Sequence, residues 1–264
     1  MSTPVSTEPM LLRLLDYWAM VYRRCWRGSI ASSFLTPLLY VVSMGVLLGG
    51  FVAGDPSKLE GAHSYLAFVA PGLIASQTMT TVFGEVTWPV QSAIKWDRTY
   101  FSMTATPLSV RDIAWGHLGF AVFRVTLVAT VFVIVLIPFG VFTSAWGLIG
   151  ALVVQPLLGL AFAAPVYAIS AWASSEAVMT MMFRLVMLPL FLFSGAFFPI
   201  ENLGSVLEWV ARITPLWQGV DLTRMVALGH VDASRAVIHV VYLIVLAAIG
   251  LRYAVRALEM RLVS

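Results

Sequence analysis

Charged side chains are scarce in this sequence, and five of them gather in one short stretch. Residues 93–116 read AIKWDRTYFSMTATPLSVRDIAWG and contain the charged residues Lys95, Asp97, Arg98, Arg111 and Asp112. Charged residues make up 11% of the 264 residues, against about a quarter in an ordinary soluble domain. Since arginine and tyrosine are favoured contact residues at interfaces, the stretch predicts a surface that docks on a partner. An ordinary solvated loop is the alternative.

No arrangement of residues indicates catalysis. The sequence lacks H-E-x-x-H, G-x-S-x-G and paired-aspartate signatures, which carry metal-dependent, nucleophilic and acid–base hydrolysis. Its four histidines, at 63, 117, 230 and 239, are scattered, and Cys25 is the single cysteine. One cysteine excludes an internal disulfide and a multi-cysteine metal site. An intramembrane transferase or protease is therefore a remote alternative, and a channel or scaffold without energy input is a third class.

A second set of charges lies within or beside apolar runs, namely Glu85, Arg124, Glu176 and Arg184. A charge at membrane depth costs several kcal/mol unless it is paired or hydrated. A structural ion pair is one interpretation, and Arg184 can also extend its head toward the membrane surface. A further interpretation is that one of these arginines faces a cavity between two copies of the protein and holds an anionic headgroup there.

The elements that must position these residues are membrane spans. Hydrophobic residues make up 60% of the chain and the mean hydropathy is +0.90, so most of the surface must face lipid. A spanning helix needs about 20 apolar residues. We expect one all-α, polytopic membrane domain over residues 1–264, with six transmembrane helices at 31–53, 64–84, 113–139, 145–172, 178–198 and 236–255.

The segment before the first span is amphipathic. Residues 11–27 place leucine, tryptophan and tyrosine at three- and four-residue steps, with arginines on the opposite face. Such a helix lies in the membrane interface. The alternative is a simple flank of the first span. The net charge of +3 gives no support for nucleic-acid binding.

Lysine and arginine in the connections set the orientation. With a cytoplasmic N-terminus, ten of them lie inside and four outside, the four being Lys58, Arg212, Arg224 and Arg235. Both termini and residues 91–112 are then cytoplasmic, and the connection that follows the fifth span is external. Residues 91–103 predict about three turns of helix, ended by Pro107. Ser109 then caps the next helix with Asp112 three residues on, as in a capping box.

Two stretches carry recognisable motifs. The first is the run R-T-Y-x-x-M-x-x-T-P-L-S, formed by Arg98, Thr99, Tyr100, Met103, Thr106, Pro107, Leu108 and Ser109. The second comprises FLFSGAFFPIENL at 191–203 and ITPLWQGVDLTRMVALG at 213–229, and contains Pro199, Pro215, Asp221 and Arg224. Both resemble the permease subunits of ABC type-2 exporters, in particular the cytoplasmic loop and the outer connection of their nodulation-type lipo-oligosaccharide branch. The resemblance covers nearly the whole chain.

This resemblance implies that residues 91–112 form a coupling loop that docks on a separate ATPase subunit, present in two copies. The implied docking residues are Lys95, Asp97, Arg98, Tyr100, Met103, Thr106, Pro107, Ser109 and Arg111. The chain has no G-x-x-x-x-G-K-[ST] phosphate loop, so it needs no cofactor of its own and ATP-Mg belongs to the partner. Residues 199–230 would form a re-entrant outer hairpin that serves as a gate, against the alternative of a hairpin without gating function.

The function implied is that of an exporter permease in a bacterial inner membrane. It would pair with a second copy or a sister permease, with spans two and five at the seam, and would contact membrane lipid. The substrate implied is an amphipathic lipid-linked saccharide or glycolipid. Efflux of a hydrophobic drug or antibiotic by the same machinery is the alternative.

Overall fold

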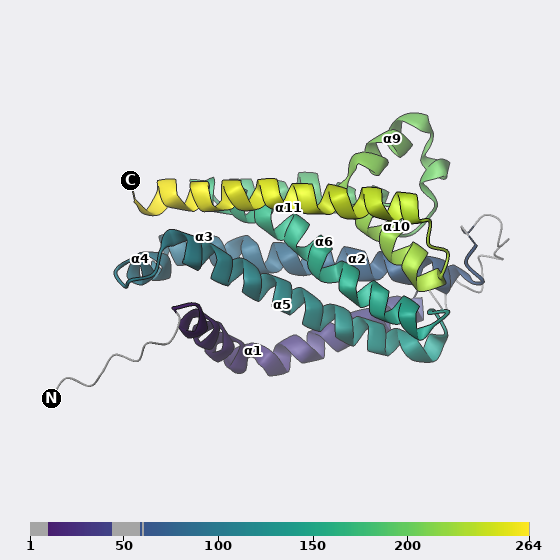
Figure 1. The fold of residues 1–264 in the computed structure, drawn as a ribbon, viewed down its shortest axis with the longest axis horizontal. Coiled ribbons are helices and arrows are strands. Elements are labelled where there is room, and N and C mark those ends of the chain that lie inside the picture. Colours follow the sequence, from purple (N-terminus) through teal and green to yellow (C-terminus); the bar gives the residue numbers. More distant parts are fainter. Residues whose placement is uncertain (1–9, 44–58, 60, 264) are drawn as a thin grey trace.

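Long helices lie side by side in this protein and form one elongated bundle (Figure 1). The computed structural model describes residues 10–43, 59 and 61–263, and no strand occurs in this part of the chain. Four helical segments are long and apolar enough to cross a membrane, namely Tyr65–Lys95, Val110–Phe139, Ala145–Trp172 and Ala233–Leu262. The all-α fold and the polytopic membrane character are confirmed.

Up to residue 172 the elements are α1 (Met10–Tyr40), α2 (Tyr65–Val86), α3 (Trp88–Lys95), α4 (Thr99–Thr104), α5 (Val110–Leu136), the short η3 (Ile137–Phe139) and α6 (Ala145–Trp172). After it come α7 (Ala177–Met181), η4 (Met182–Met187), α8 (Leu188–Phe193), η5 (Ile200–Leu203), α9 (Ser205–Ile213), α10 (Pro215–Leu228) and α11 (Ala233–Leu262).

Four of the expected spans, 64–84, 113–139, 145–172 and 236–255, fall within these long segments. The expected boundary after residue 27 is absent, because α1 is one continuous helix to Tyr40. The remainder of the expected span 31–53, from residue 44 onward, lies outside the described residues. The expected span 178–198 is shorter: the apolar helix runs over Ala177–Phe193, with a π-helical middle in η4, and the chain then turns.

Hydroxyl and carboxylate caps mark where several of these helices begin. Ser64 accepts a hydrogen bond from Ala67 N at 3.1 Å, and Ser144 accepts one from Gly147 N at 3.0 Å. Asp232 caps α11 through Ser234 N at 2.9 Å. Each cap satisfies a backbone N–H that has no partner within its own helix. Polar residues at the ends of apolar runs thus fix the first turn of each span.

Helix α6 lies at the centre and packs against α2, α5, α10 and α11. Small residues allow this close packing: a Cβ on Gly250 of α11 would lie 2.6 Å from Pro165 Cδ of α6. A Cβ on Gly219 of α10 would lie 2.5 Å from Leu158 Cδ2 of α6. Glycine at such positions lets helices in membranes approach closely.

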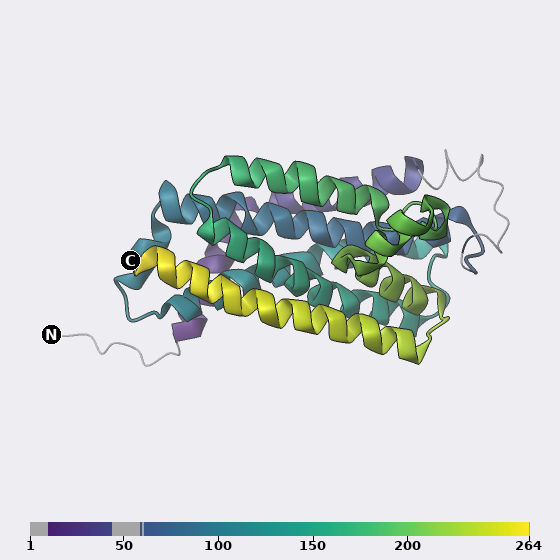
Figure 2. The same cartoon turned by 90° about the horizontal axis from the view of Figure 1, so that it is seen from above.

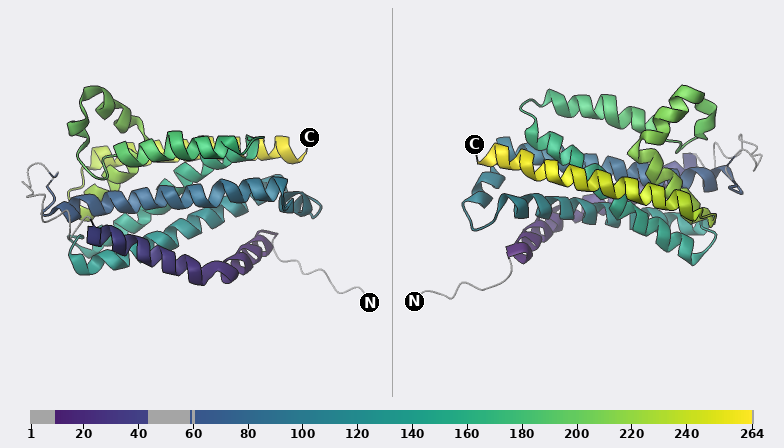
Figure 3. Two further views of the ribbon diagram at one scale, coloured as in Figure 1. Left: turned by 180° about the vertical axis from the view of Figure 1, so that it is seen from behind. Right: turned by 45° about the horizontal axis from the view of Figure 1, so that its top comes forward.

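The two ends of the bundle carry different elements. Helices α3 and α4 and the C-terminus of α11 lie at one end, and the hairpin of α9 and α10 lies at the other (Figures 1 and 2). The segment α7–η4–α8 lies at the edge of the bundle (Figures 2 and 3). It leaves Leu185, Leu188 and Leu192 exposed. One face of this helix is therefore uncovered within a single chain.

Candidate functional site

The loop between α3 and α4 turns sharply at Arg98. Helix α3 closes with Trp96 N and Asp97 N both donating to Ser92 O, at 3.1 and 2.9 Å, and the Ser92 hydroxyl donates to the Asp97 carboxylate. Arg98 then takes a left-handed conformation with φ +52°, the one positive φ of a non-glycine residue in the described ranges. The prediction of one helix over 91–103 is therefore wrong, because a left-handed residue cannot continue a right-handed helix.

The second half of the loop follows its prediction. Ser109 N donates to Asp112 Oδ2 at 3.0 Å, and Asp112 N donates to Ser109 Oγ at 3.2 Å, which completes a capping box. Helix α4 ends at Thr104, and Pro107 lies in the turn between the two helices. This reciprocal cap fixes the direction in which the loop enters α5.

Tyr100 is 1% exposed, so it cannot contact a partner as the sequence predicts. Its position comes from the turn at Arg98, which directs α4 back over the bundle. The Tyr100 hydroxyl donates to His117 Nδ1 and accepts from the Tyr167 hydroxyl at 3.2 Å. Burial raises the pKa of Tyr100 well above its usual value of 10, so the phenol stays neutral.

His117 extends this chain of hydrogen bonds by donating from Nε2 to the backbone carbonyl of Glu85 at 2.9 Å. The hydrogen bonds run from Tyr167 on α6, through Tyr100 on α4 and His117 on α5, to the accepting carbonyl of Glu85 on α2. Each group donates once in this direction, which sets a neutral imidazole with its proton on Nε2. Tyr100 thus anchors the loop to three membrane helices.

The outer surface of the loop is polar and largely exposed. Of the docking residues expected from the sequence, Asp97, Arg98, Thr106, Pro107, Ser109 and Arg111 are exposed, and Lys95 and Met103 are half-buried. Arg111 lies 3.8 Å from the carboxylate of Glu259 near the end of α11. A hollow of about 400 Å³ lies between α3, α4 and α11, and its lining includes Lys95, Arg98 and Arg261. Three cations at one place make a surface suited to an acidic partner.

Arg261 and Trp96, which is 53% exposed, were missed by sequence reasoning. The tryptophan stands directly before Asp97 and Arg98, so an aromatic within a charged run was the available signal. Arg261 gave no such signal, since it reaches the loop only through the packing of α11.

The charges within the spans divide into a pair and two separate residues. Arg124 Nε lies 2.9 Å from Glu85 Oε1, and its guanidinium carbon lies 5.2 Å from the centroid of the Tyr22 ring. The ion-pair interpretation is confirmed for Arg124. Arg184 and Glu176 are both exposed at the edge of the bundle, on η4 and at the start of α7, and no ion pair joins them in the described structure.

In the hairpin, the two prolines sit at helix starts: Pro199 directly precedes η5 and Pro215 is the first residue of α10. Arg224, 3% exposed, donates from Nε to Phe68 O at 3.2 Å and from Nη2 to Gly195 O at 2.7 Å. Its guanidinium carbon lies 4.0 Å from the centroid of the Phe68 ring. Asp221 contacts His239 of α11 rather than Arg224, with Oδ2 and Nε2 2.9 Å apart.

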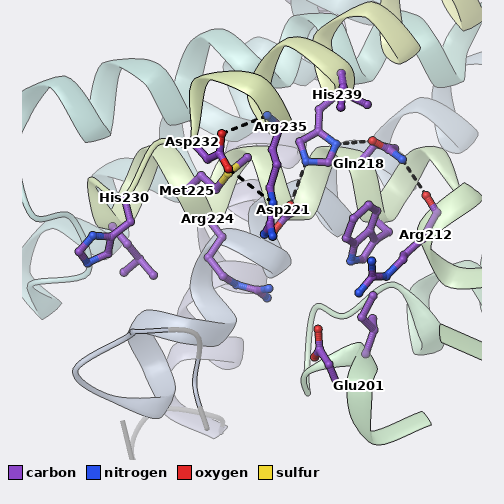
Figure 4. A pocket seen from close by; sticks show the side chains of 14 residues that line it. Glu201, Arg212, Gln218, Asp221, Arg224, Met225, His230, Asp232, Arg235 and His239 are labelled. Atoms are coloured by element: carbon purple, nitrogen blue, oxygen red, sulfur yellow. Dashed lines mark hydrogen bonds and ion pairs between the residues drawn. The ribbon is translucent and has the colours of Figure 1, made fainter. Parts of the chain in front are cut away.

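A polar pocket of about 540 Å³ opens between η5, α10 and α11 (Figure 4). Its lining contains Ile200, Glu201, Arg212, Trp217, Gln218, Asp221, Arg224, Met225, Leu228, His230, Asp232, Arg235, Ile238 and His239. Sequence reasoning found only Asp221 and Arg224. The available signal was the three- and four-residue spacing of 218, 221, 225 and 228, which puts those residues on one face of α10.

Comparison with known proteins gives one family. The model of the ABC-2 type transporter family matches residues 14–228. The chain is 31% identical to "Nodulation protein J" of Neorhizobium galegae over 86% of each chain, and 32% identical to "Nodulation protein J" of Rhizobium leguminosarum bv. trifolii over 81% of this chain and 82% of the relative. It is 23% identical to "Inner membrane transport permease YadH" of Escherichia coli K12, over 76% of this chain and 72% of the relative.

Proposed function

The chain belongs to the ABC-2 type transporter family as a membrane permease, and on that premise we propose that it exports a lipid-linked saccharide or glycolipid across a bacterial inner membrane. The permease subunits of this family are not catalytic, and their transport requires an ATPase partner. The energy for export would enter through residues 91–112. The observation that carries this role is the exposed charged surface of the loop, held on the bundle by the buried Tyr100.

Coupling needs a surface that transmits movement without deforming. The loop satisfies this requirement because its buried anchor, Tyr100 on α4, lies only two residues from the exposed Arg98. Displacement of α4 pulls on Tyr167 and His117 through hydrogen bonds, and therefore on α5 and α6. ATP-driven closure of two ATPase subunits would in this way tilt the spans. A six-span topology with both termini cytoplasmic, which we propose from the distribution of lysine and arginine, would put this loop on the ATPase side.

A second permease copy or a sister permease would cover the edge helix α7–η4–α8. This helix exposes Leu185, Leu188 and Leu192 and carries the exposed Arg184 among them. A charge in such an apolar face is costly against lipid, and a protein partner or a hydrated cavity relieves that cost. The hairpin 199–230 would act as the outer gate beside this seam.

The substrate class rests on the resemblance to nodulation-type exporters and on the relatives named nodulation protein J. An amphipathic molecule also suits a protein that offers both a polar pocket and an apolar groove near its hairpin. Export of a hydrophobic drug remains the second candidate, favoured by the apolar groove alone.

The coupling role is tested by removing the charge of Arg98 without straining its backbone. Glycine takes φ near +52° without cost, so Arg98→Gly keeps the turn and deletes the cation. We expect the purified permease to retain its fold and to lose at least ten-fold in ATPase subunit recovered and in substrate-stimulated ATP hydrolysis. Arg98→Lys should keep most of both.

The matched control is Arg252→Gln, which removes an exposed cation of α11 outside the loop and its hollow. Wild-type recovery and hydrolysis in Arg98→Gly would overturn the coupling assignment.

The mass of the wild-type complex, measured by native mass spectrometry, should correspond to two permeases and two ATPase subunits. A complex with one of each would refute the stoichiometry.

A further inference from the structure

The polar pocket lies at the end of the bundle opposite the coupling loop, where α10 meets the start of α11 (Figures 1 and 4). Its volume of about 540 Å³ falls within the roughly 300–1,000 Å³ of small-molecule sites. Nothing in the coupling role requires a polar cavity at this end. The chemistry of the side chains that line the pocket can therefore indicate which class of ligand it binds.

The formal charges of the arginines and carboxylates in the lining are balanced, and its three arginines are already engaged. Three arginines, at 212, 224 and 235, face three carboxylates, at 201, 221 and 232. Arg212 pairs with Glu208 at 2.6 Å, Arg235 with Asp232 at 3.6 Å, and Arg224 donates to two backbone carbonyls. An anionic ligand would have to compete with these acceptors. The balance favours a neutral ligand that both donates and accepts hydrogen bonds.

One wall of the pocket is held together by hydrogen bonds, which are drawn as dashed lines in Figure 4. Gln218 Nε2 donates to the backbone carbonyl of Arg212 at 2.7 Å, which directs Gln218 Oε1 toward His239 Nδ1. His239 Nε2 in turn contacts Asp221 Oδ2 at 2.9 Å. Both ring nitrogens thus face oxygen atoms of neighbouring side chains, and these two contacts fix the orientation of the imidazole ring. A pre-organised polar wall lowers the cost of binding a polar ligand.

The remaining lining is amphipathic. The ring of Trp217, half-buried, has the guanidinium carbon of Arg212 5.8 Å from its centroid and His239 at its edge, with 5.4 Å between ring centroids. Glu201 and His230 are exposed at the mouth. An aromatic ring beside planar side chains with paired donor and acceptor atoms suits a sugar, which has an apolar face of C–H groups and a rim of vicinal hydroxyls.

An apolar groove of about 600 Å³ lies next to the pocket, on the other side of the same hairpin segment. Trp209, Val210 and Ile213 line the groove, and Arg212, Trp217 and Gln218 line the polar pocket. The groove continues along α6 and η4 to Phe83 of α2. Residues 209–218 thus contribute to the lining of both spaces, and a molecule with a polar head and an acyl tail matches the chemistry of the two.

We propose that the polar pocket binds the saccharide headgroup of the exported lipid-linked substrate, with Trp217 as the stacking platform, and that the adjacent groove takes its tail. This proposal rests on the proposed export function and adds a binding site to it. Glu201 would accept hydrogen bonds from sugar hydroxyls, and the Gln218–His239–Asp221 wall would hold the pocket open.

The test uses the purified permease–ATPase complex in lipid nanodiscs, with cellobiose, lactose and N,N′-diacetylchitobiose as soluble probes, measured by saturation-transfer NMR. We expect at least one disaccharide to bind with a dissociation constant on the order of millimolar, and inorganic phosphate at equal concentration not to displace it. Trp217→Leu and Glu201→Gln should each weaken binding at least five-fold, and Trp217→Phe should retain more of it than Trp217→Leu.

The matched control is Trp146→Leu, which removes an 80% exposed tryptophan at the start of α6 that lines neither space. Binding that survives both Trp217→Leu and Glu201→Gln, absence of binding by all three sugars, or displacement by phosphate would overturn the pocket assignment. A glycolipid transport assay separates the two proposals. Normal export by Trp217→Leu would refute the pocket and leave the function standing, whereas sugar binding without glycolipid export would refute the function and leave the pocket.

Discussion

Tyr100 shows how one buried hydroxyl can hold a surface loop in place. Its neighbours Arg98 and Ser102 are exposed, yet Tyr100 lies between α5 and α6 and bonds to both through His117 and Tyr167. A buried donor or acceptor that loses its partner costs more than the hydrogen bond contributes. The hydroxyl therefore fixes where α4 sits, while the residues around it remain available to a partner.

Replacing Tyr100 with phenylalanine keeps the ring and removes the hydroxyl. We expect Tyr100→Phe to lower the free energy of unfolding by about 1–3 kcal/mol, since His117 Nδ1 and the Tyr167 hydroxyl lose their partner. Thermal unfolding in nanodiscs measures this effect. Tyr253→Phe, at a tyrosine 60% exposed on α11, should leave the transition unchanged. Equal unfolding temperatures for wild type and Tyr100→Phe would show that the hydrogen bonds of Tyr100 contribute nothing to stability.

At the scale of elements, the contact between α6 and α11 determines the shape of the bundle. Gly250 lies against the ring and backbone nitrogen of Pro165, where a Cβ would be 2.6 Å from Cδ and 2.7 Å from N. Proline leaves α6 without one backbone donor, and glycine lets α11 approach at that place. The pair brings α11 close enough to α6 and α10 for His239 to reach Gln218 and Asp221.

Gly250→Ala should therefore push the two helices apart. We expect a loss of about 1–3 kcal/mol in stability, because the added methyl meets backbone rather than a flexible side chain. Gly84→Ala is the matched control: nothing lies within 4 Å of its Cβ, and alanine favours helix by up to about 1 kcal/mol. Chemical denaturation monitored by circular dichroism distinguishes them, and equal stability of the two variants would contradict the close-approach argument.

At the scale of the whole molecule, the two specialised surfaces lie at opposite ends of the bundle (Figure 1). The charged loop joins α3 to α5 at one end, and the hairpin and its polar pocket lie at the other. The proposed export function needs this separation, because energy would enter on the ATPase side and substrate would leave on the other. The orientation proposed for the chain follows from its asymmetric distribution of lysine and arginine.

Single cysteines test this orientation in a Cys25→Ser background. Asn202→Cys in η5 should react with a membrane-impermeant maleimide in intact spheroplasts, and Ser102→Cys in α4 should react only after permeabilisation, since both positions are exposed at opposite ends. Mass spectrometry of the labelled chain gives the readout. Labelling of residue 102 from outside would reverse the proposed topology.

Local patterns determined much of this protein. Long apolar runs predicted four of the helices that can span a membrane, and the Ser109–Asp112 spacing predicted the capping box at the start of α5. The motifs around Arg98 and Pro199 indicated the family that the comparisons confirm. These features depend on residues three or four apart or on average hydropathy, so the sequence carries them without knowledge of the fold.

Only the tertiary structure decided which side chains meet. Arg98 breaks the expected helix, Tyr100 turns inward rather than toward a partner, and the polar pocket joins residues from η5, α10 and α11. The contacts responsible link positions 17 residues apart for Tyr100 and His117, and 21 apart for Gln218 and His239. Pairings over such separations arise from helix packing, which no local spacing encodes.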